Sequence, residues 1–134
     1  MRIVINEIPK SPNGKSGTIR MNWWKRPAYR RYWHGLVRAA IDNSHNPCNQ
    51  RMRVVISQMR RRKLDRDNLW ASNKIVLDAL TAWKLIKDDS EKWIELDCTQ
   101  VVGKEKWTII TIENVVELEA GVEQLGLRAM GMGA

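Results

Sequence analysis

The sequence contains no phenylalanine, only two cysteines and four prolines, and no long apolar run. Cys48 and Cys98 stand far apart, so they match neither a disulfide framework nor a pair of metal ligands. A membrane span takes roughly 18 consecutive apolar residues, and no stretch approaches that length. Residues 1–10 lack the basic start and apolar run of a signal peptide. These absences predict a reduced protein in the cytoplasm, with no membrane partner.

The chain has 134 residues, of which 43% are apolar, enough to form one hydrophobic core but too few for two. This composition excludes collagen-like, low-complexity and wholly disordered proteins. Because phenylalanine is absent, the seven tryptophans must supply much of the aromatic bulk. Trp33 and Tyr32 are predicted to lie in the core. Internal packing or a dimer face is predicted for Trp70, Trp83, Trp93 and Trp107.

Positive charge is concentrated in the first half of the chain. The net charge is +8, with 16 basic and three acidic residues over 1–66 but seven basic and 12 acidic residues over 67–134. A basic half of this density is typical of proteins that bind a polyanion, because each cation that neutralises a phosphate releases condensed counterions. Nucleic acid is therefore the expected partner, although ribosome association or simple solubility also fits the charge alone.

Hydropathy patterning predicts a small single α+β domain, with a mixed sheet of about four strands and two main helices. The strands are expected over Arg2–Ile8, Arg51–Met59, Trp93–Val102 and Lys106–Ile112, and the helices over Pro27–Asp42 and Leu69–Trp83. Asp67 or Asn68 is the expected N-cap of the second helix. Gly103 and Lys104 separate the last two strands, which predicts a hairpin. The domain is expected to span 1–114, followed by a C-terminal extension over 115–134 that forms a short helix or a frayed tail.

Two acidic pairs stand out in this basic protein, Asp65 with Asp67 and Asp88 with Asp89. If the second strand extends to Asp67, the side chains of Asp65 and Asp67 point to the same side of it. Such close carboxylates repel unless a cation lies between them, which either the neighbouring basic run Arg60–Lys63 or Mg²⁺ could supply. The second pair follows the second helix on a turn that could fold back. An acidic cluster within a basic surface suits metal-dependent phosphodiester hydrolysis.

Lys74 lies on the second predicted helix, where helical periodicity places it within roughly 40° of Asp67 and Asp78. From that face it could reach a phosphate oxygen, or simply pair with Asp78 four residues later. A plainer interpretation of the whole segment also stands. In that interpretation 65–68 is a charged turn with a helix cap, and Lys74 with Asp78 is a surface ion pair.

The complete pattern resembles the signature of the RusA family of Holliday junction resolvases. The similar residues are Asp65-Arg66-Asp67-Asn68-Leu69, then Lys74, then Asp78-Ala79-Leu80, then Asp88-Asp89. The N-terminal part is similar as well, in Pro9, Pro12 and Asn13, followed by Arg20, Met21 and a helix rich in basic and aromatic residues. The resemblance covers about Ile3–Ile112. It implies a RusA-like fold and a homodimeric nuclease that uses Mg²⁺, or Mn²⁺ in its place, to nick four-way DNA junctions.

By this resemblance Asp65, Asp67 and Asp89 are the metal-binding carboxylates, Lys74 is the catalytic lysine and Asn68 is the motif asparagine. The bacterial founder of the family has its lysine four residues after the second aspartate, whereas Lys74 follows Asp67 by seven. Three extra residues are nearly one helical turn, so the lysine would keep its face and move about 4–5 Å along the axis. The unshifted position holds an alanine, which cannot replace a lysine chemically. The family is common in phages and prophages, which implies a bacterial cytoplasm.

A basic surface around these residues is predicted to hold the DNA backbone. Its candidate residues are Asn13, Arg20, Lys25, Arg26, Arg30, Arg31, Arg60, Arg61, Arg62, Lys63, Arg66 and Asn68. Trp23 and Trp24 lie among them and could either stack on unpaired bases or pack internally. His34, His45 and the cysteines show no zinc-ligand or nucleophile pattern. No small-molecule cofactor is expected. Two alternatives stay open: a non-catalytic DNA-binding module of the same fold, and a nuclease acting on other branched DNA.

Overall fold

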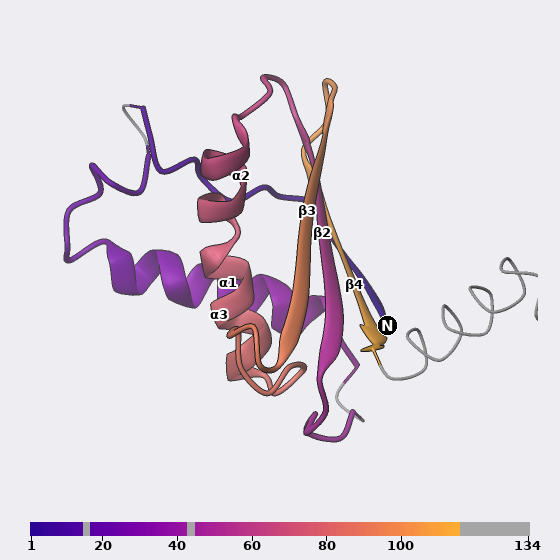
Figure 1. Cartoon of the computed structure of the whole chain (residues 1–134). Helices are drawn as coiled ribbons and strands as arrows, with labels where there is room; N and C mark the ends of the chain where they lie inside the picture. The colour runs from indigo at the N-terminus through magenta and orange to yellow at the C-terminus, as the bar shows by residue number, and fades with distance from the viewer. Residues whose placement is uncertain (15–16, 43–44, 116–134) are drawn as a thin grey trace, which may run out of the picture.

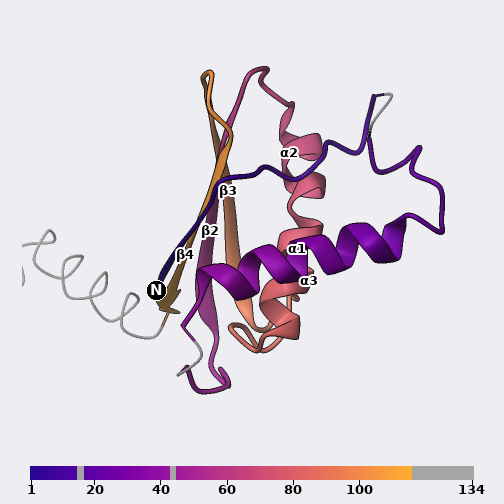
Figure 2. The same ribbon diagram turned by 180° about the vertical axis from the view of Figure 1, so that it is seen from behind.

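A computed structural model describes residues 1–14, 17–42 and 45–115 of the chain. In this part a four-stranded mixed sheet is covered on one face by three helices (Figure 1, Figure 2). The elements are β1 (Arg2–Ile5), α1 (Arg26–Ala40), β2 (Met52–Arg60), α2 (Arg66–Ser72), α3 (Lys74–Ala82), β3 (Ile94–Val102) and β4 (Trp107–Asn114). The predicted α+β class is therefore confirmed. Apart from Val115, the predicted C-terminal extension lies outside the described residues.

The strand order is β1-β4-β2-β3, with β2 parallel to β3 and antiparallel to β4. The predicted hairpin between the last two strands is wrong, because β2 lies between them. The connection instead crosses the end of β2, where the Gly103 N–H donates to the Arg60 carbonyl oxygen at 2.8 Å. A Cβ on Gly103 would stand 2.6 Å from Met59 Sδ, so glycine is what allows the chain to pass this closely.

The core fills the space between the sheet and the helices. Alternate residues of β2 and β4 point toward the helices, and Val54, Ile56 and Ile110 are fully buried. Trp33 of α1 is 1% exposed, as predicted. Tyr32 is 51% exposed, so its predicted core position is wrong. Each residue turns a helix by about 100°, and the turn that buries Trp33 directs Tyr32 away from the sheet.

The predicted second helix is in fact two helices, α2 and α3, separated at Asn73. Asn73 is fully buried; its side chain accepts a hydrogen bond from Gln58 Nε2 at 2.7 Å and donates to the Leu69 carbonyl oxygen at 3.3 Å. The Ser72 hydroxyl donates to the same carbonyl at 2.6 Å. Side-chain bonds of this kind compete with the helical ladder and explain the break. Lys74 therefore begins α3. The prediction that it lies two turns into a continuous helix is wrong.

The geometry assumed for the first acidic pair is also wrong. β2 ends at Arg60, so Asp65 and Asp67 are not alternate residues of a strand. Asp65 is the N-cap of α2, in place of the predicted Asp67 or Asn68, and Asp67 is the second residue of the helix. The short connection between β2 and α2 brings both carboxylates to the first turn of α2. In the described part of the chain, no helix is both long and apolar enough to cross a membrane.

Candidate active site

Asp65 and Asp67 lie at the start of α2, and both are exposed. Asp65 Oδ1 accepts a hydrogen bond from the Asn68 backbone N–H at 2.9 Å, and Oδ2 accepts one from Asn68 Nδ2 at 3.2 Å. These two bonds orient the carboxylate, while each oxygen keeps a lone pair for a further partner. The Asp67 carboxylate forms no hydrogen bond or ion pair with another described residue. One carboxylate is thus held in place and its neighbour is free to bind a ligand.

Asn13 connects the N-terminal loop to this turn. Its Nδ2 donates to Asn68 Oδ1 at 3.0 Å, across 55 residues of sequence. The loop is itself compact, because a Cβ on Gly17 would overlap the carbonyl oxygen of Asn13. The structure therefore brings together the two segments that carry the family resemblance, and a chain of hydrogen bonds runs from Asn13 through Asn68 to Asp65.

A buried polar network supports the same region from below. Arg60 Nη1 donates to the Pro9 carbonyl oxygen at 3.0 Å and to Gln58 Oε1 at 2.6 Å. Gln58 Nε2 then donates to Asn73 Oδ1 and to Ser72 Oγ, at 2.7 and 3.2 Å. Burial lowers the pKa of the Arg60 guanidinium. The network joins the N-terminal loop, the end of β2 and the break between α2 and α3, and so fixes their relative positions.

The basic run between β2 and α2 divides into a buried and an exposed part. Arg60 is 8% exposed and belongs to the network, whereas Arg61, Arg62 and Lys63 are exposed. The end of this loop is fixed by Gln100, whose side chain accepts from the Leu64 N–H at 3.0 Å and donates to the Leu64 carbonyl oxygen at 2.6 Å. The three exposed cations therefore lie directly before the anchored start of α2.

Lys74 lines a groove between α1 and the α2–α3 pair, together with Arg26, Arg30 and Asp78. It forms no ion pair with Asp78 or with any other described residue, so the surface ion pair of the plainer interpretation is absent. Ala71, at the unshifted position, lines the same groove. Lys74 is accordingly an available cation in a basic groove, next to α2 but not among the residues that line a hollow with Asp65.

Asp89 lies on the turn between α3 and β3 and is exposed. It lines a hollow with Trp70 and residues 94–96, whereas Asp65 lines a different hollow with Trp70 and residues 97–100. Over 1–14, 17–42 and 45–115, no three His, Cys, Asp or Glu side chains form a group that could hold a metal ion. Within one chain Asp65 and Asp67 thus share the first turn of α2, whereas Asp89 lines a separate hollow.

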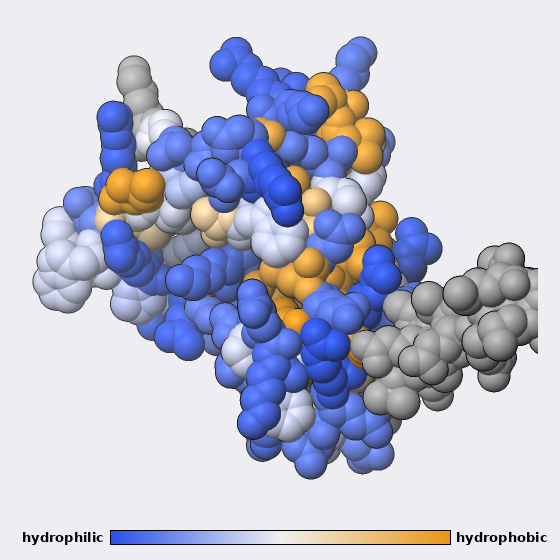
Figure 3. Space-filling model, in the orientation of Figure 1, coloured by the Kyte–Doolittle hydropathy of each residue, from blue (hydrophilic) through white to orange (hydrophobic). Residues whose placement is uncertain are grey.

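The expected DNA-binding cations are available for a polyanion. Arg51 pairs with Glu95 at 3.1 Å, but none of the candidate DNA-binding residues forms an ion pair with a described residue. Arg26, Arg30 and Arg31 are exposed on α1. Figure 3 shows a largely hydrophilic face, with the apolar colour gathered mainly along the sheet. Cations without acidic partners keep their full attraction for a phosphate backbone.

Trp23 and Trp24 are exposed just before α1, at 77% and 60%. Their rings meet edge to face with centroids 6.0 Å apart. Of the two alternatives left open by the sequence, the structure excludes internal packing for this pair. Trp70, Trp83, Trp93 and Trp107 are half-buried. Arg66 stands 5.8 Å over the Trp70 ring.

The histidines and the buried cysteine do not add a reactive group to this region. His34 Nε2 is buried without a hydrogen-bond partner, and burial lowers the pKa of this imidazole. His45 contacts the carbonyl oxygens of Asp42 and Trp83, each at 2.9 Å, and these bonds raise its pKa. Burial raises the pKa of the Cys98 thiol to about 11, so this thiol is not a nucleophile at neutral pH.

The donor chemistry at the start of α2 fits Mg²⁺. This ion is usually bound through one or two carboxylates, with water and phosphate oxygens completing its octahedron. Asp65 and Asp67 supply two exposed carboxylates, and no described cation pairs with either of them. Each of these side chains therefore offers carboxylate oxygens to a divalent cation, whose remaining ligands would come from water and DNA.

No family model matches this chain, and no curated protein is significantly similar to it.

Gln58, Asn73 and Gln100 support the site and were not predicted from the sequence. A signal for Gln58 was nevertheless present, because it continues the inward-facing positions of Val54 and Ile56 along β2. A polar residue at a core position needs a buried partner. Asn73, in the middle of an otherwise apolar helical pattern, is that partner.

Proposed function

We propose that this protein is a Mg²⁺-dependent endonuclease that nicks branched DNA, with the four-way junction as its substrate. The observation that supports this most strongly is the hydrogen-bonded chain from Asn13 through Asn68 to Asp65. It fixes one carboxylate beside Asp67, which is exposed and has no partner among the described residues. A merely solvated charged turn needs no such support from a loop 55 residues away.

In this proposal the chain holds the metal and the DNA, and a bound Mg²⁺ supplies the activated water and Lewis acidity for phosphodiester hydrolysis. Asp65 and Asp67 hold the ion, and Asn68 orients Asp65. The exposed cations Arg61–Lys63 contact the DNA backbone next to the site. Lys74 neutralises charge on a phosphate in its groove.

A homodimer with twofold symmetry accounts for paired nicks, because it presents the same site twice to the two strands of a junction. In the dimer, Asp89 contributes to the metal site when metal and DNA are bound. We place this activity in a bacterial cytoplasm, encoded by the host or by a phage. Mn²⁺ is expected to replace Mg²⁺, since both accept carboxylate and water ligands.

A non-catalytic DNA-binding module is the second candidate. It is favoured by one observation, that no three acidic, His or Cys side chains in the described ranges form a metal-binding group. Such a module would bind junctions in a salt-sensitive manner without any dependence on Mg²⁺.

A nicking assay separates the two candidates. Wild-type protein is incubated with a labelled four-way junction and with a linear duplex of matching sequence, each in Mg²⁺ and in EDTA. Paired symmetric nicks on the junction in Mg²⁺ alone are the expected result. Tight junction binding with no cleavage in Mg²⁺ or Mn²⁺ would reject the nuclease and leave the binding module. Cleavage of a flap or a three-way junction in preference to the four-way junction would show that the four-way junction is not the substrate.

A further inference from the structure

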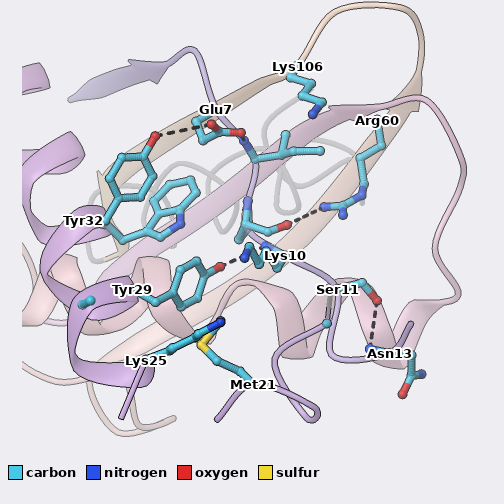
Figure 4. A pocket seen from close by; sticks show the side chains of 15 residues that line it. Glu7, Lys10, Ser11, Asn13, Met21, Lys25, Tyr29, Tyr32, Arg60 and Lys106 are labelled. Atoms are coloured by element: carbon cyan, nitrogen blue, oxygen red, sulfur yellow. Dashed lines mark hydrogen bonds between the residues drawn. The ribbon is translucent and has the colours of Figure 1, made fainter. Parts of the chain in front are cut away.

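A cavity of about 770 Å³ lies between the N-terminal loop, α1 and the end of β2 (Figure 4). Its principal lining residues are Glu7, Lys10, Tyr29, Tyr32, Arg60 and Lys106. Asp65, Asp89 and Lys74 line other hollows, so this cavity does not contain the proposed catalytic residues. It adjoins their support, because Asn13, which bonds to Asn68, lines it. Its volume lies in the range of sites that bind small organic molecules.

Positive charge is in excess around this cavity. Arg60 is 8% exposed, and its Nη1 donates to two carbonyl oxygens and to no described carboxylate. Lys10, Lys25 and Lys106 are exposed and form no ion pair with a described residue. Among the described residues that line the cavity, only Glu7 is acidic. Burying a cation without an anion costs free energy, so the site becomes more favourable when an anion binds.

Two aromatic rings form another part of the wall. Figure 4 shows Tyr29 and Tyr32 on one side of the 7–10 segment, with Arg60 and Lys106 on its other side. The Tyr29 hydroxyl accepts from the Lys10 N–H at 2.9 Å. The Tyr32 hydroxyl donates to Glu7 Oε2 at 3.4 Å, and Tyr32 is 51% exposed. Tyr32 therefore offers an accessible ring on one side of the 7–10 segment, and Arg60 and Lys106 line the same cavity on the other side.

We propose that this cavity binds one unpaired nucleotide of the DNA substrate, which lies across the 7–10 segment with its base against Tyr32 and its phosphate near Arg60 and Lys106. A nucleotide combines the two properties that the wall selects, a flat aromatic group and an anion, and bases stack on aromatic side chains irrespective of sequence. The inference depends on the proposed function for the source of that nucleotide. At a branch point, base pairing and stacking are interrupted, so extruding one nucleotide costs less there than within a duplex.

Photo-crosslinking tests this placement. A junction with 5-iododeoxyuridine at an unpaired position beside the branch point is irradiated with the full chain in EDTA, where no cleavage competes. We expect the crosslinked peptide to contain Tyr29 or Tyr32, as identified by mass spectrometry. A crosslink confined to Trp23 or Trp24 overturns the proposal, because these tryptophans do not line the cavity. A junction that crosslinks to no residue of the cavity overturns it as well.

Affinity for the same DNA in EDTA gives a second, independent measurement. We expect Tyr32→Ala to weaken binding about tenfold, the effect of losing one base–aromatic contact. Lys106→Gln should weaken it about threefold or more, whereas Lys104→Gln should change it by less than about twofold. Lys104 is the matched control, since it is an exposed lysine on the same connection that does not line the cavity. Equal effects of the two lysine substitutions overturn the proposal.

Two further comparisons distinguish a free nucleotide from a nucleotide of the DNA, and the nucleotide site from the proposed nuclease activity. Micromolar dTMP that displaces the DNA would identify a free nucleotide as the ligand and overturn the assignment to DNA. A Tyr32 crosslink without any nicking rejects the nuclease and supports the nucleotide site. Nicking with a crosslink outside the cavity rejects the nucleotide site and supports the nuclease.

Discussion

The two acidic segments of this protein differ in how firmly the fold holds them. At the start of α2, Asp65 accepts two hydrogen bonds from Asn68, and Asn68 accepts one from Asn13. On the turn before β3, Asp88 and Asp89 are exposed, and neither side chain bonds to a described residue. Equal charge therefore does not mean equal preorganisation. The α2 segment offers one oriented ligand, Asp65, with Asp67 in the same turn, whereas a metal ion, DNA or a second chain has to bring Asp89 to the site.

The largest expected effect comes from the carboxylate that has no structural bond. Asp67→Asn preserves shape and should lower Mg²⁺-dependent nicking about a hundredfold or more, because a metal ligand is lost while the fold is unchanged. Glu105→Gln removes an exposed carboxylate elsewhere and should keep wild-type activity. The measurement is the initial nicking rate on a four-way junction. Full activity of the Asp67 variant would contradict a metal role for the α2 segment.

The polar network beneath the α2 segment predicts a large effect on stability. Gln58→Leu removes the side chain that hydrogen-bonds to both Arg60 and Asn73 in a buried region. Because two buried polar groups then lack a partner, the free energy of unfolding should fall by about 2–3 kcal/mol. Ser57→Ala, at the adjacent position of β2 that points to the other face, should cost about 0.5 kcal/mol. Urea unfolding followed by tryptophan fluorescence compares the two. A loss for Gln58→Leu no larger than for Ser57→Ala would show that the network contributes little.

The third prediction compares the acidic segments directly. Asp65→Ala removes the N-cap of α2 and should lower the free energy of unfolding by about 1 kcal/mol. Asp89→Ala removes a side chain without partners in the described chain and should change it by less than about 0.5 kcal/mol. Both should reduce nicking if both carboxylates reach the metal. The same urea titration provides the answer, and equal stability losses would remove the distinction between the segments.

The smallest expected effect concerns pH. The hydrogen bonds of His45 to the Asp42 and Trp83 carbonyl oxygens raise its pKa above 6.5, so the folded chain holds the proton more tightly than the unfolded chain. This contribution to stability is complete below the unfolded pKa and is lost as pH rises through the raised folded value. Between pH 5.5 and 8.5, the Tm of His45→Gln should therefore fall less than the Tm of the wild type. Parallel Tm profiles would contradict this role.

The sequence predicts those parts of the fold that depend on local periodicity. α1 and β2 match their predicted positions within two residues, and Trp33 is buried as expected. The prediction of a β3–β4 hairpin was wrong, because the order of strands in a mixed sheet depends on whether a distant strand lies between two others, as β2 does here. The prediction of one continuous helix was wrong, because the break at Asn73 depends on a hydrogen bond from Gln58, which is distant in sequence.

The candidate site was predictable as a set of residues and not as a geometry. The contact of Asn13 with Asn68 joins segments that composition alone does not connect, although the family resemblance includes both. Asp65 was selected as a metal ligand, but its helix-capping role depends on where β2 ends. The cavity around Tyr32 has no sequence signature, because its walls come from three separate segments.

Mapping the metal by local oxidative cleavage tests the central claim, that a divalent cation binds at the start of α2. Fe²⁺ replaces Mg²⁺, and ascorbate with peroxide then cuts the backbone near the bound ion. We predict cleavage around 65–68 in the wild type, suppressed by excess Mg²⁺ and lost in Asp67→Asn. Cleavage that falls elsewhere, or that persists unchanged in Asp67→Asn, would contradict a metal site at this turn.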